Sequence, residues 1–334
     1  MLLIFFCAFL SFIVVWLLTP WLIRYLRRIG LLVQDANKEH KPLVPLSGGL
    51  VVFSGFFTGM MFFIFHRTFL SQHVTGGILL DTYDLLLLLS GITTILIITF
   101  VGFLDDLVIK ANKESSSGLR QWQKPLLTLV AAVPLMVVNA GVDTMIVPFI
   151  GRVNFGILYP LLLVPLGIVG ASNMVNMLAG FNGMETGMGL VYIGMLGLYA
   201  YTHDRYLAAL IALLLWVALL AFFFFNKYPA KILPGDSLTY LLGGSLAVIA
   251  ILGNMERAAI IASIPFFIEF LLKMRGKLKV ASYGYYKNGC VMSHYTKIYS
   301  IPHFFTITGK FTERQITLFM MLISLFFSLL MWVV

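Results

Sequence analysis

The chain has 334 residues, of which 60% are hydrophobic and only 11% are charged. Soluble domains are about half apolar and about a quarter charged, so this composition excludes an ordinary soluble domain and is typical of a protein embedded in lipid. The formal net charge of +9 does not indicate nucleic-acid binding, because basic residues that flank membrane helices explain it better.

Apolar segments of about 20 residues, the length that crosses a bilayer, follow one another along the chain. The first, 2–23, carries its basic residues after the apolar run, which is the wrong order for a cleaved signal peptide. We expect an all-α polytopic membrane protein with about ten transmembrane helices, in one domain over residues 1–334. The predicted spans are 2–23, 48–65, 85–103, 125–139, 157–171, 187–201, 207–225, 238–252, 258–272 and 315–334.

Lysine and arginine are distributed unevenly between the connections of these spans. If the connection after the first span is placed inside, the inner connections carry 19 basic residues and the outer ones carry 4. Basic residues collect on the cytoplasmic side of membrane proteins. This distribution therefore predicts that both termini lie outside and that the polar connections, including the long segment 273–314, form an active-site region on the cytoplasmic face.

Two adjacent carboxylates, Asp105 and Asp106, follow the third span in the sequence Gly102-Phe-Leu-Asp-Asp. Adjacent acids repel each other unless a cation is near, so such a pair suits a divalent metal ion or a proton-accepting base. The alternative is a solvated helix end that Lys110 neutralises, and for an isolated Asp-Asp this is the better interpretation. Lys124 ends the same connection.

The connection after the fifth span, 171–187, has no Lys or Arg but contains three Asn, one Glu and three Gly. Amide groups bind hard cations and hydrogen-bond to a base or ribose, and glycine lets the backbone approach a ligand. A turn-rich helix connection explains the same composition equally well. The candidate residues here are Asn173, Asn176, Gly180, Asn182 and Glu185.

Asp236 begins the eighth span, and viewed alone it is a helix N-cap. It would lie, however, at the same membrane depth as Asp105, Asp106 and Asn176, and four separate caps explain such a cluster poorly. Glu269 lies within the ninth span, where an ionised acid costs about 2.5–3.5 kcal/mol.

For Glu269 we expect a structural role, with Lys273 one helical turn later as its partner. In the first inner connection, the basic residues, among them Lys38, could hold a phosphate. Anchoring to anionic lipid is the simpler explanation of these basic residues.

Together these segments resemble the polyprenyl-phosphate N-acetylhexosamine-1-phosphate transferase superfamily, over most of the chain from Asp35 to Arg314. The resemblance is carried by Gly102-Phe-Leu-Asp-Asp, Asn173-x-x-Asn176-x-x-Ala-Gly-x-Asn182-Gly and Pro234-Gly-Asp-Ser.

Bacterial members typically carry Asp where this chain has Ala179 and Asn182, and a His-rich motif in the last inner loop, which is absent here. The chain is therefore more similar to the eukaryotic and archaeal branch. That branch includes the tunicamycin-sensitive UDP-N-acetylglucosamine:dolichyl-phosphate N-acetylglucosamine-1-phosphate transferase of N-glycan assembly.

The resemblance implies transfer of N-acetylglucosamine-1-phosphate, or a related hexosamine phosphate, from a UDP-sugar donor to dolichyl or polyprenyl phosphate, with Mg²⁺ (or Mn²⁺) as cofactor and UMP as product. It implies metal ligation by Asn176 and Asp236, phosphate neutralisation by Lys124, and orientation or deprotonation of the lipid phosphate by Asp105 and Asp106. The substrate-binding residues that it implies are Lys38, Asn173, Gly180, Asn182 and Glu185.

A polytopic transporter is the main alternative from another class, because ten helices and an intramembrane Glu269 suit one. Transporter sites usually lie near the midplane between inverted repeats, and no repeat is visible here. The modest length favours a prokaryotic, archaeal cell membrane over the endoplasmic reticulum. The segment 273–314 departs from the eukaryotic sugar-recognition segment, so the exact sugar stays open. The lipid length and a homodimer, which relatives often form, also stay open.

Overall fold

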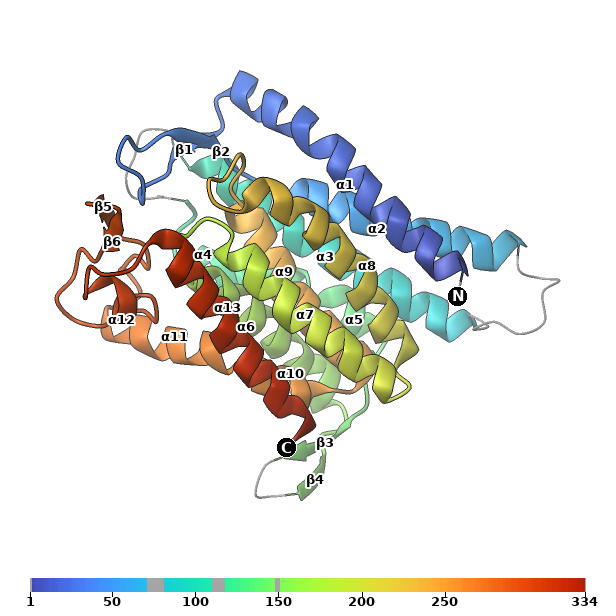
Figure 1. The fold of residues 1–334 in the computed structure, drawn as a ribbon. Coiled ribbons are helices and arrows are strands. Elements are labelled where there is room, and N and C mark those ends of the chain that lie inside the picture. Colours follow the sequence, from blue (N-terminus) through green and yellow to red (C-terminus); the bar gives the residue numbers. More distant parts are fainter. Residues whose placement is uncertain (1, 71–80, 110–117, 148–150, 334) are drawn as a thin grey trace.

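The computed structural model of the chain describes residues 2–70, 81–109, 118–147 and 151–333, and this part is mostly helical (Figure 1). Its helices are α1 (Leu2–Ile29), α2 (Gly49–Phe65), α3 (Thr82–Val108), α4 (Gln123–Val130), α5 (Val133–Val137), α6 (Val164–Met177), α7 (Met184–Thr202), α8 (Tyr206–Asn226), α9 (Gly235–Gly253), α10 (Glu256–Ala262), α11 (Ile264–Arg275), α12 (His303–Thr306) and α13 (Glu313–Leu329).

Short elements complete the described chain. The π-helical turns η1 (His66–Leu70) and η2 (Tyr159–Leu163) adjoin α2 and α6, and the 3₁₀ turn η3 (Leu330–Trp332) follows α13. Three antiparallel hairpins pair β1 (Leu32–Gln34) with β2 (Leu43–Pro45), β3 (Thr144–Val147) with β4 (Gly151–Asn154), and β5 (Tyr285–Lys287) with β6 (Cys290–Met292).

The expectation of a mostly helical, polytopic membrane protein is confirmed, but the count of about ten crossings is only partly matched. Each expected span coincides with a helix or a pair of helices, and seven of the described helices are long and apolar enough to cross a membrane. The fourth and ninth spans are broken, into α4–α5 and α10–α11. Pro134 and Pro265 stand at these breaks, where proline's missing N–H and its ring interrupt a helix.

Helix α9 forms the centre of the bundle, where it packs against α3, α6, α8 and α2. Every residue from Ser237 to Gly253 is buried. Glycines allow close backbone contact: a Cβ at Gly102 would lie 2.3 Å from the Asp236 carbonyl oxygen, and one at Gly243 would lie 2.4 Å from the Ala171 carbonyl oxygen. The ends of α3 and α6 are thereby brought to the start of α9.

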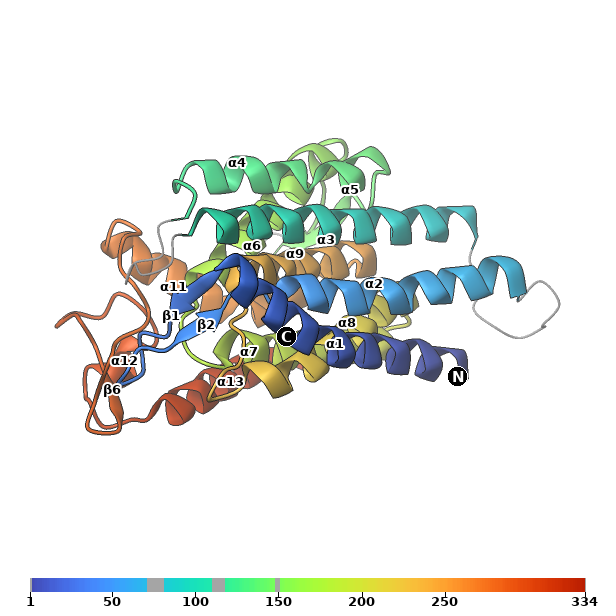
Figure 2. The same ribbon diagram turned by 90° about the horizontal axis from the view of Figure 1, so that it is seen from above.

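One end of the bundle collects most of the polar connections. Figure 1 shows the hairpins β1–β2 and β5–β6 there, with the two termini and β3–β4 at the opposite end. Seen from above in Figure 2, α3 and α9 lie between α4 on one side and α13 on the other. The starts of α4 and α9 and the end of α3 therefore meet at the same end of the bundle, which is where the candidate site lies.

Candidate active site

A lysine bridges two carboxylates at the polar end of the bundle. The Lys124 Nζ, from the first turn of α4, lies 2.5 Å from Oδ2 of Asp105 and 2.9 Å from Oδ2 of Asp236. Asp105 belongs to the last turns of α3 and Asp236 to the first turn of α9. The structure thus brings together three residues that the sequence places in separate connections. Lys110, the alternative neutralising cation, lies outside the described residues.

The charge of Lys124 is maintained by its neighbours. Burial, the largest single influence, works against the ammonium form, but the carboxylates of Asp236 and Asp105 outweigh it and raise the pKa of Lys124 above its usual range. A buried lysine without such partners would lose its proton more easily. The bridge therefore places an ammonium group between the side chains of Asp105 and Asp236.

Asn176 extends this cluster from the end of α6. Its Nδ2 donates a 3.3 Å hydrogen bond to Oδ2 of Asp236, and its Oδ1 accepts a 2.8 Å hydrogen bond from the Thr239 hydroxyl. Thr239, which the sequence analysis did not select, lies three residues after Asp236 on α9 and so shares its helix face. That spacing was visible in the sequence.

Asp106 has a different role from its neighbour Asp105. It is fully buried, and its carboxylate accepts hydrogen bonds from the backbone N–H groups of Asp236 (2.7 Å) and Ser237 (3.2 Å). The N–H groups in the first turn of a helix have no acceptor within the helix, so a side chain from α3 caps α9. The interpretation of Asp236 as an N-cap is therefore wrong: Asp236 lies inside the first turn, and Asp106 supplies the capping carboxylate.

The residues of the cluster fit a divalent cation. Mg²⁺ prefers carboxylate and carbonyl oxygens and completes its shell with water and substrate phosphates, and Asp105, Asp236 and Asn176 offer such oxygens in one place. Among the described residues no group of three or more His, Cys, Asp and Glu side chains forms a site that could hold a metal. A cation here would thus depend on few protein ligands together with a phosphate-bearing substrate.

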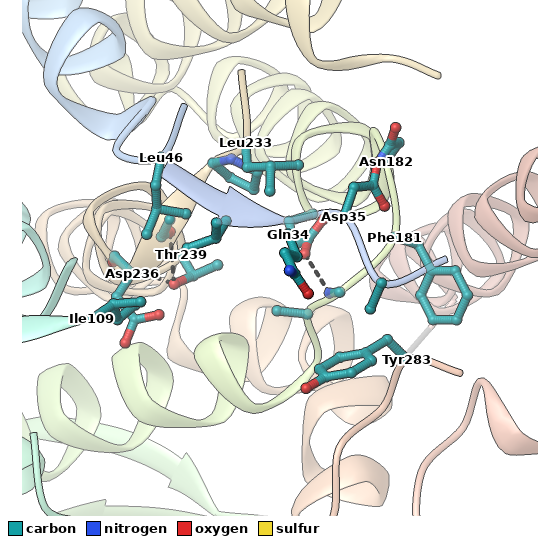
Figure 3. Close-up of a pocket in the computed structure, with 17 residues that line it drawn as sticks. Gln34, Asp35, Leu46, Ile109, Phe181, Asn182, Leu233, Asp236, Thr239 and Tyr283 are labelled. Carbon is teal, nitrogen blue, oxygen red and sulfur yellow. Dashed lines mark hydrogen bonds between the residues drawn. The ribbon is translucent and has the colours of Figure 1, made fainter. Parts of the chain in front are cut away.

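A cavity of about 190 Å³ adjoins the cluster. In Figure 3, Asp236 and Ile109 lie on one side of this pocket and Asn182, Phe181 and Tyr283 on the other. Its remaining lining residues are Val33, Gln34, Asp35, Ala36, Leu46, Ala179, Gly180, Glu185, Leu233, Pro234, Gly235 and Thr239. Three of the candidates, Gly180 and Asn182 between α6 and α7 and Glu185 in the first turn of α7, therefore line the pocket that Asp236 also lines.

Asn182 is held by protein partners on all sides. Its Nδ2 donates to Oδ2 of Asp35 (3.0 Å), its Oδ1 accepts from the Ala230 N–H (2.8 Å), and its own N–H donates to Oε1 of Glu313 (2.7 Å). The residue is 3% exposed. These bonds fix the loop between α6 and α7 and use one of the two amide hydrogens and one lone pair of the amide oxygen.

Two further candidates are also engaged elsewhere. Lys38 forms ion pairs with Asp35 (3.1 Å) and with Glu313, so its charge is compensated rather than available to a phosphate. Asn173 donates to the Thr128 hydroxyl (3.1 Å) and to the Val169 carbonyl (2.8 Å), and it does not line the pocket.

Glu269 is a buried anchor for the segment after α11. Its carboxylate accepts hydrogen bonds from the Ser282 hydroxyl (3.2 Å), the Ser300 hydroxyl (2.7 Å) and the Ile301 N–H (2.7 Å). The expected pairing with Lys273 is confirmed at 3.7 Å. The Ser282 hydroxyl oxygen also lies 3.2 Å from the Met177 carbonyl oxygen, next to Asn176, so Glu269 holds the segment after α11 against the end of α6.

A bundle of apolar helices with this buried charged cluster at one end defines an integral membrane enzyme. The family described as "Glycosyl transferase family 4" matches residues 88–254, which is half of the chain and contains the whole cluster. The chain therefore belongs to glycosyl transferase family 4. It is a phosphoglycosyltransferase that transfers a phospho-N-acetylhexosamine to a polyprenyl phosphate.

Individual relatives agree with this membership. A protein of Saccharolobus solfataricus, provisionally assigned as a UDP-N-acetylglucosamine–dolichyl-phosphate N-acetylglucosaminephosphotransferase, is 34% identical over 92% of this chain and 89% of its own. A protein of Sulfolobus acidocaldarius with the same provisional assignment is 32% identical over 96% and 92%. The phospho-N-acetylmuramoyl-pentapeptide-transferase of Halalkalibacterium halodurans is 32% identical over 80% and 83%.

Proposed function

We propose that the protein transfers N-acetylglucosamine-1-phosphate from UDP-N-acetylglucosamine to dolichyl phosphate and releases UMP, the first membrane step of glycan assembly. The observation that carries the proposal is the bridge of Lys124 between Asp105 and Asp236, beside a pocket at the polar end of a membrane bundle. A water-soluble nucleotide and a lipid phosphate can meet only at such an end. The assigned activities of the two archaeal relatives support the choice of sugar and lipid.

The reaction joins two anions. An oxygen of the lipid phosphate forms a bond to the phosphorus that carries the sugar, the bond from that phosphorus to the bridging oxygen breaks, and UMP leaves with the electron pair. A phosphate monoester is largely ionised at neutral pH, since its second pKa is about 6. Catalysis then depends on positioning and on charge neutralisation more than on a strong base.

The chain's own residues divide this work. Asn176 and Asp236 would hold Mg²⁺ or Mn²⁺, which when bound neutralises diphosphate charge. Lys124 places a second positive charge beside them. Asp105 orients the lipid phosphate, and Asp106 acts through Asp236 by fixing the start of α9.

The proposed location of the protein and of its site rests on the distribution of basic residues and on the similarity to archaeal proteins. The excess of basic residues at the polar end supports a cytoplasmic site with both termini outside. The similarity to two archaeal proteins supports an archaeal cell membrane. We treat residues 1–334 as a single transferase domain, because the pocket takes residues from β1, α9 and the segment before β5.

The deciding experiment incubates the purified, detergent-solubilised protein with Mg²⁺, dolichyl phosphate and UDP-N-acetylglucosamine and measures UMP. We expect lipid-dependent UMP release that EDTA or tunicamycin abolishes. Release with other UDP-hexosamines only would correct the sugar. No release with any donor, from protein shown to be folded, would overturn the proposal and favour a transporter.

A further inference from the structure

The buried side chain of Asn37 joins three distant segments of the chain. Asn37 lies between β1 and β2 and is 2% exposed. Its Nδ2 donates a 2.6 Å hydrogen bond to the Gly180 carbonyl, and its Oδ1 accepts a 3.1 Å hydrogen bond from the Gly284 N–H. These two backbone partners are 143 and 247 positions away in the chain. One amide therefore ties the connection after β1 to the loop between α6 and α7 and to the segment before β5.

Each of these three segments contributes to the wall of the pocket in the candidate site. The lining residues next to the three joined positions include Asp35, Ala36, Phe181 and Tyr283. In Figure 3, Phe181 and Tyr283 lie on the side of the pocket away from Asp236. Asn37 itself does not line this pocket, so any effect on a bound ligand passes through the residues that do.

The loop between α6 and α7 meets the segment before β5 at Gly180 and Tyr283. Gly180 has a φ of +131°, and a Cβ there would lie 3.0 Å from Cβ and Cδ1 of Tyr283, closer than most carbon contacts. The Gly180 N–H also donates a 2.6 Å hydrogen bond to Oε1 of Glu185. Asn37 and Glu185 thus hold both polar backbone groups of Gly180, and the pocket wall contains a close contact that depends on accurate placement of its two sides.

Tyr283 is positioned by the residues on either side of it in the sequence. Ser282 is buried, and its hydroxyl donates a 3.2 Å hydrogen bond to Oε1 of Glu269. On the other side, the Gly284 N–H donates to Asn37. Loss of the Asn37 amide would remove the anchor at Gly284 and would let Tyr283 move away from the loop that it contacts.

We propose that Asn37 is a positioning residue of the pocket, which fixes the separation of Gly180 and Tyr283 and thereby sets the affinity for the nucleotide-sugar donor. This assignment rests on the proposed function, because it takes a UDP-sugar as the occupant. Residues behind a site commonly fix its geometry in this way. The bridge of Lys124 is held by its own ion pairs, so the chemical step should be affected much less than donor binding.

Two variants separate hydrogen bonding from the filling of space. Asn37→Ala removes both bonds and most of the side chain. Asn37→Asp keeps the volume and an acceptor for the Gly284 N–H, but it places an oxygen against the Gly180 carbonyl, where the wild type has a donor. If Asn37 only filled space, the aspartate variant would behave as the wild type does.

The test measures kcat, the KM of each substrate and the Kd of UDP-N-acetylglucosamine with Mg²⁺ for the purified full-length protein. A residue that supports only donor binding changes KM and leaves kcat unchanged. We expect both variants to raise the donor KM and Kd by at least about 10-fold, with kcat and the KM of dolichyl phosphate within about 3-fold of the wild type.

The matched control is Tyr159→Phe, which removes another buried long-range hydrogen bond, to Glu256. Tyr159 lies shortly after β4, at the opposite end of the bundle from the pocket. This variant should leave the donor KM and Kd unchanged. Circular dichroism compares the folding of all the variants, and Asn37→Asp carries the test if Asn37→Ala does not fold.

The assignment is overturned if Asn37→Asp binds the donor as tightly as the wild type, or if Asn37→Ala does. It is also overturned if kcat and both KM values change together in the folded variants, since general loosening would then explain the effect. Failure of the proposed function is distinguishable: the wild type would bind the UDP-sugar without lipid-dependent UMP release, and the Kd values would still test Asn37. A wild type that binds no UDP-sugar would overturn both.

Discussion

Lys38 and Glu313 form an ion pair across 275 positions of the chain. The pair joins the connection after α1 to the first residue of α13. Both residues are also linked to Asn182: Lys38 pairs with Asp35, which accepts a hydrogen bond from Asn182, and Glu313 accepts one from the Asn182 N–H. The first and last parts of the chain therefore both bind the loop between α6 and α7, which lines one side of the pocket.

The first prediction concerns this pair. Lys38→Met and Glu313→Gln should each lower the stability of the protein, because breaking a buried ion pair leaves an uncompensated charge and costs about 3–5 kcal/mol. The double variant should lose less than the sum of the two, with a coupling of at least about 1 kcal/mol. Unfolding in detergent, followed by circular dichroism, measures all four proteins. Glu39→Gln, at an exposed neighbour, serves as control, and strictly additive losses would contradict the prediction.

Lys124→Met tests the bridge between Asp105 and Asp236. We expect the rate of UMP release to fall by at least about 100-fold, as when other preorganised charges are removed from active sites. Because the ammonium occupies the space between the carboxylates, its removal should also tighten Mn²⁺ binding, which electron paramagnetic resonance detects. Loss of activity with weaker Mn²⁺ binding would show that Lys124 does not share these carboxylates with the cation.

Titration of Lys124 should not lower the folding stability of the protein at neutral or mildly alkaline pH. The pKa of Lys124 is raised in the folded protein. The stabilising contribution of its charge is therefore fully present at pH values below the pKa of the unfolded chain, and it is lost only as the pH rises through the pKa of the folded protein. Since an ordinary lysine titrates near pH 10.4, thermal stability in the wild type should not decline more than in Lys124→Met below about pH 10. A difference that disappears between pH 7 and 9 would contradict this.

Substitutions of Asp236 and Asn176 should change the Mg²⁺ dependence of activity. Asp236→Asn is expected to abolish turnover without unfolding the protein. Asn176→Ala should do the same at ordinary Mg²⁺ concentrations, because each removes one of few oxygen ligands. A Mg²⁺ titration of activity, with circular dichroism as the folding check, measures both. Retained turnover in either variant would refute the metal assignment.

The two cysteines allow a direct test of sidedness. Cys7 is buried in α1, while Cys290 lies partly exposed on β6 at the polar end. A membrane-impermeant maleimide should label Cys290 in inverted vesicles and not in right-side-out ones. The control combines Cys290→Ser with Asp204→Cys, in the exposed connection between α7 and α8, which should reverse the pattern. Labelling of Cys290 from outside would invert the topology.

Much of this architecture could be predicted from the sequence, because apolar runs and turn-rich connections are local patterns. The apolar runs predicted the positions of the helices. The common membrane depth of Asp105, Asn176 and Asp236 predicted that their side chains lie close together. The role predicted for Lys124 came from the resemblance of the whole chain to the family. These features need only neighbouring residues to be recognised.

Other features depend on distances that local patterns do not contain. Asp106 caps α9 because Gly102 lets α3 approach its backbone, and an adjacent Asp-Asp gives no sign that its two members differ. Lys38 looked like a phosphate ligand because Glu313 lies at the far end of the chain. The hydrogen bonds of Asn182 could not be predicted either, because its three partners belong to three separate segments.

The burial of α9 separates the reaction from the bilayer. In the most apolar stretch of α9, 89% of the residues are buried, against 22% in that of α1. Contacts with other helices therefore set the depth of Asp236 in the membrane. A membrane of different thickness must be accommodated by tilt or local strain of lipid-facing helices, and α1 would adjust before α9. The enzyme should therefore keep working in a foreign host whose lipids differ from its own, and adaptation to a new membrane can proceed through α1 while the reaction centre stays unchanged.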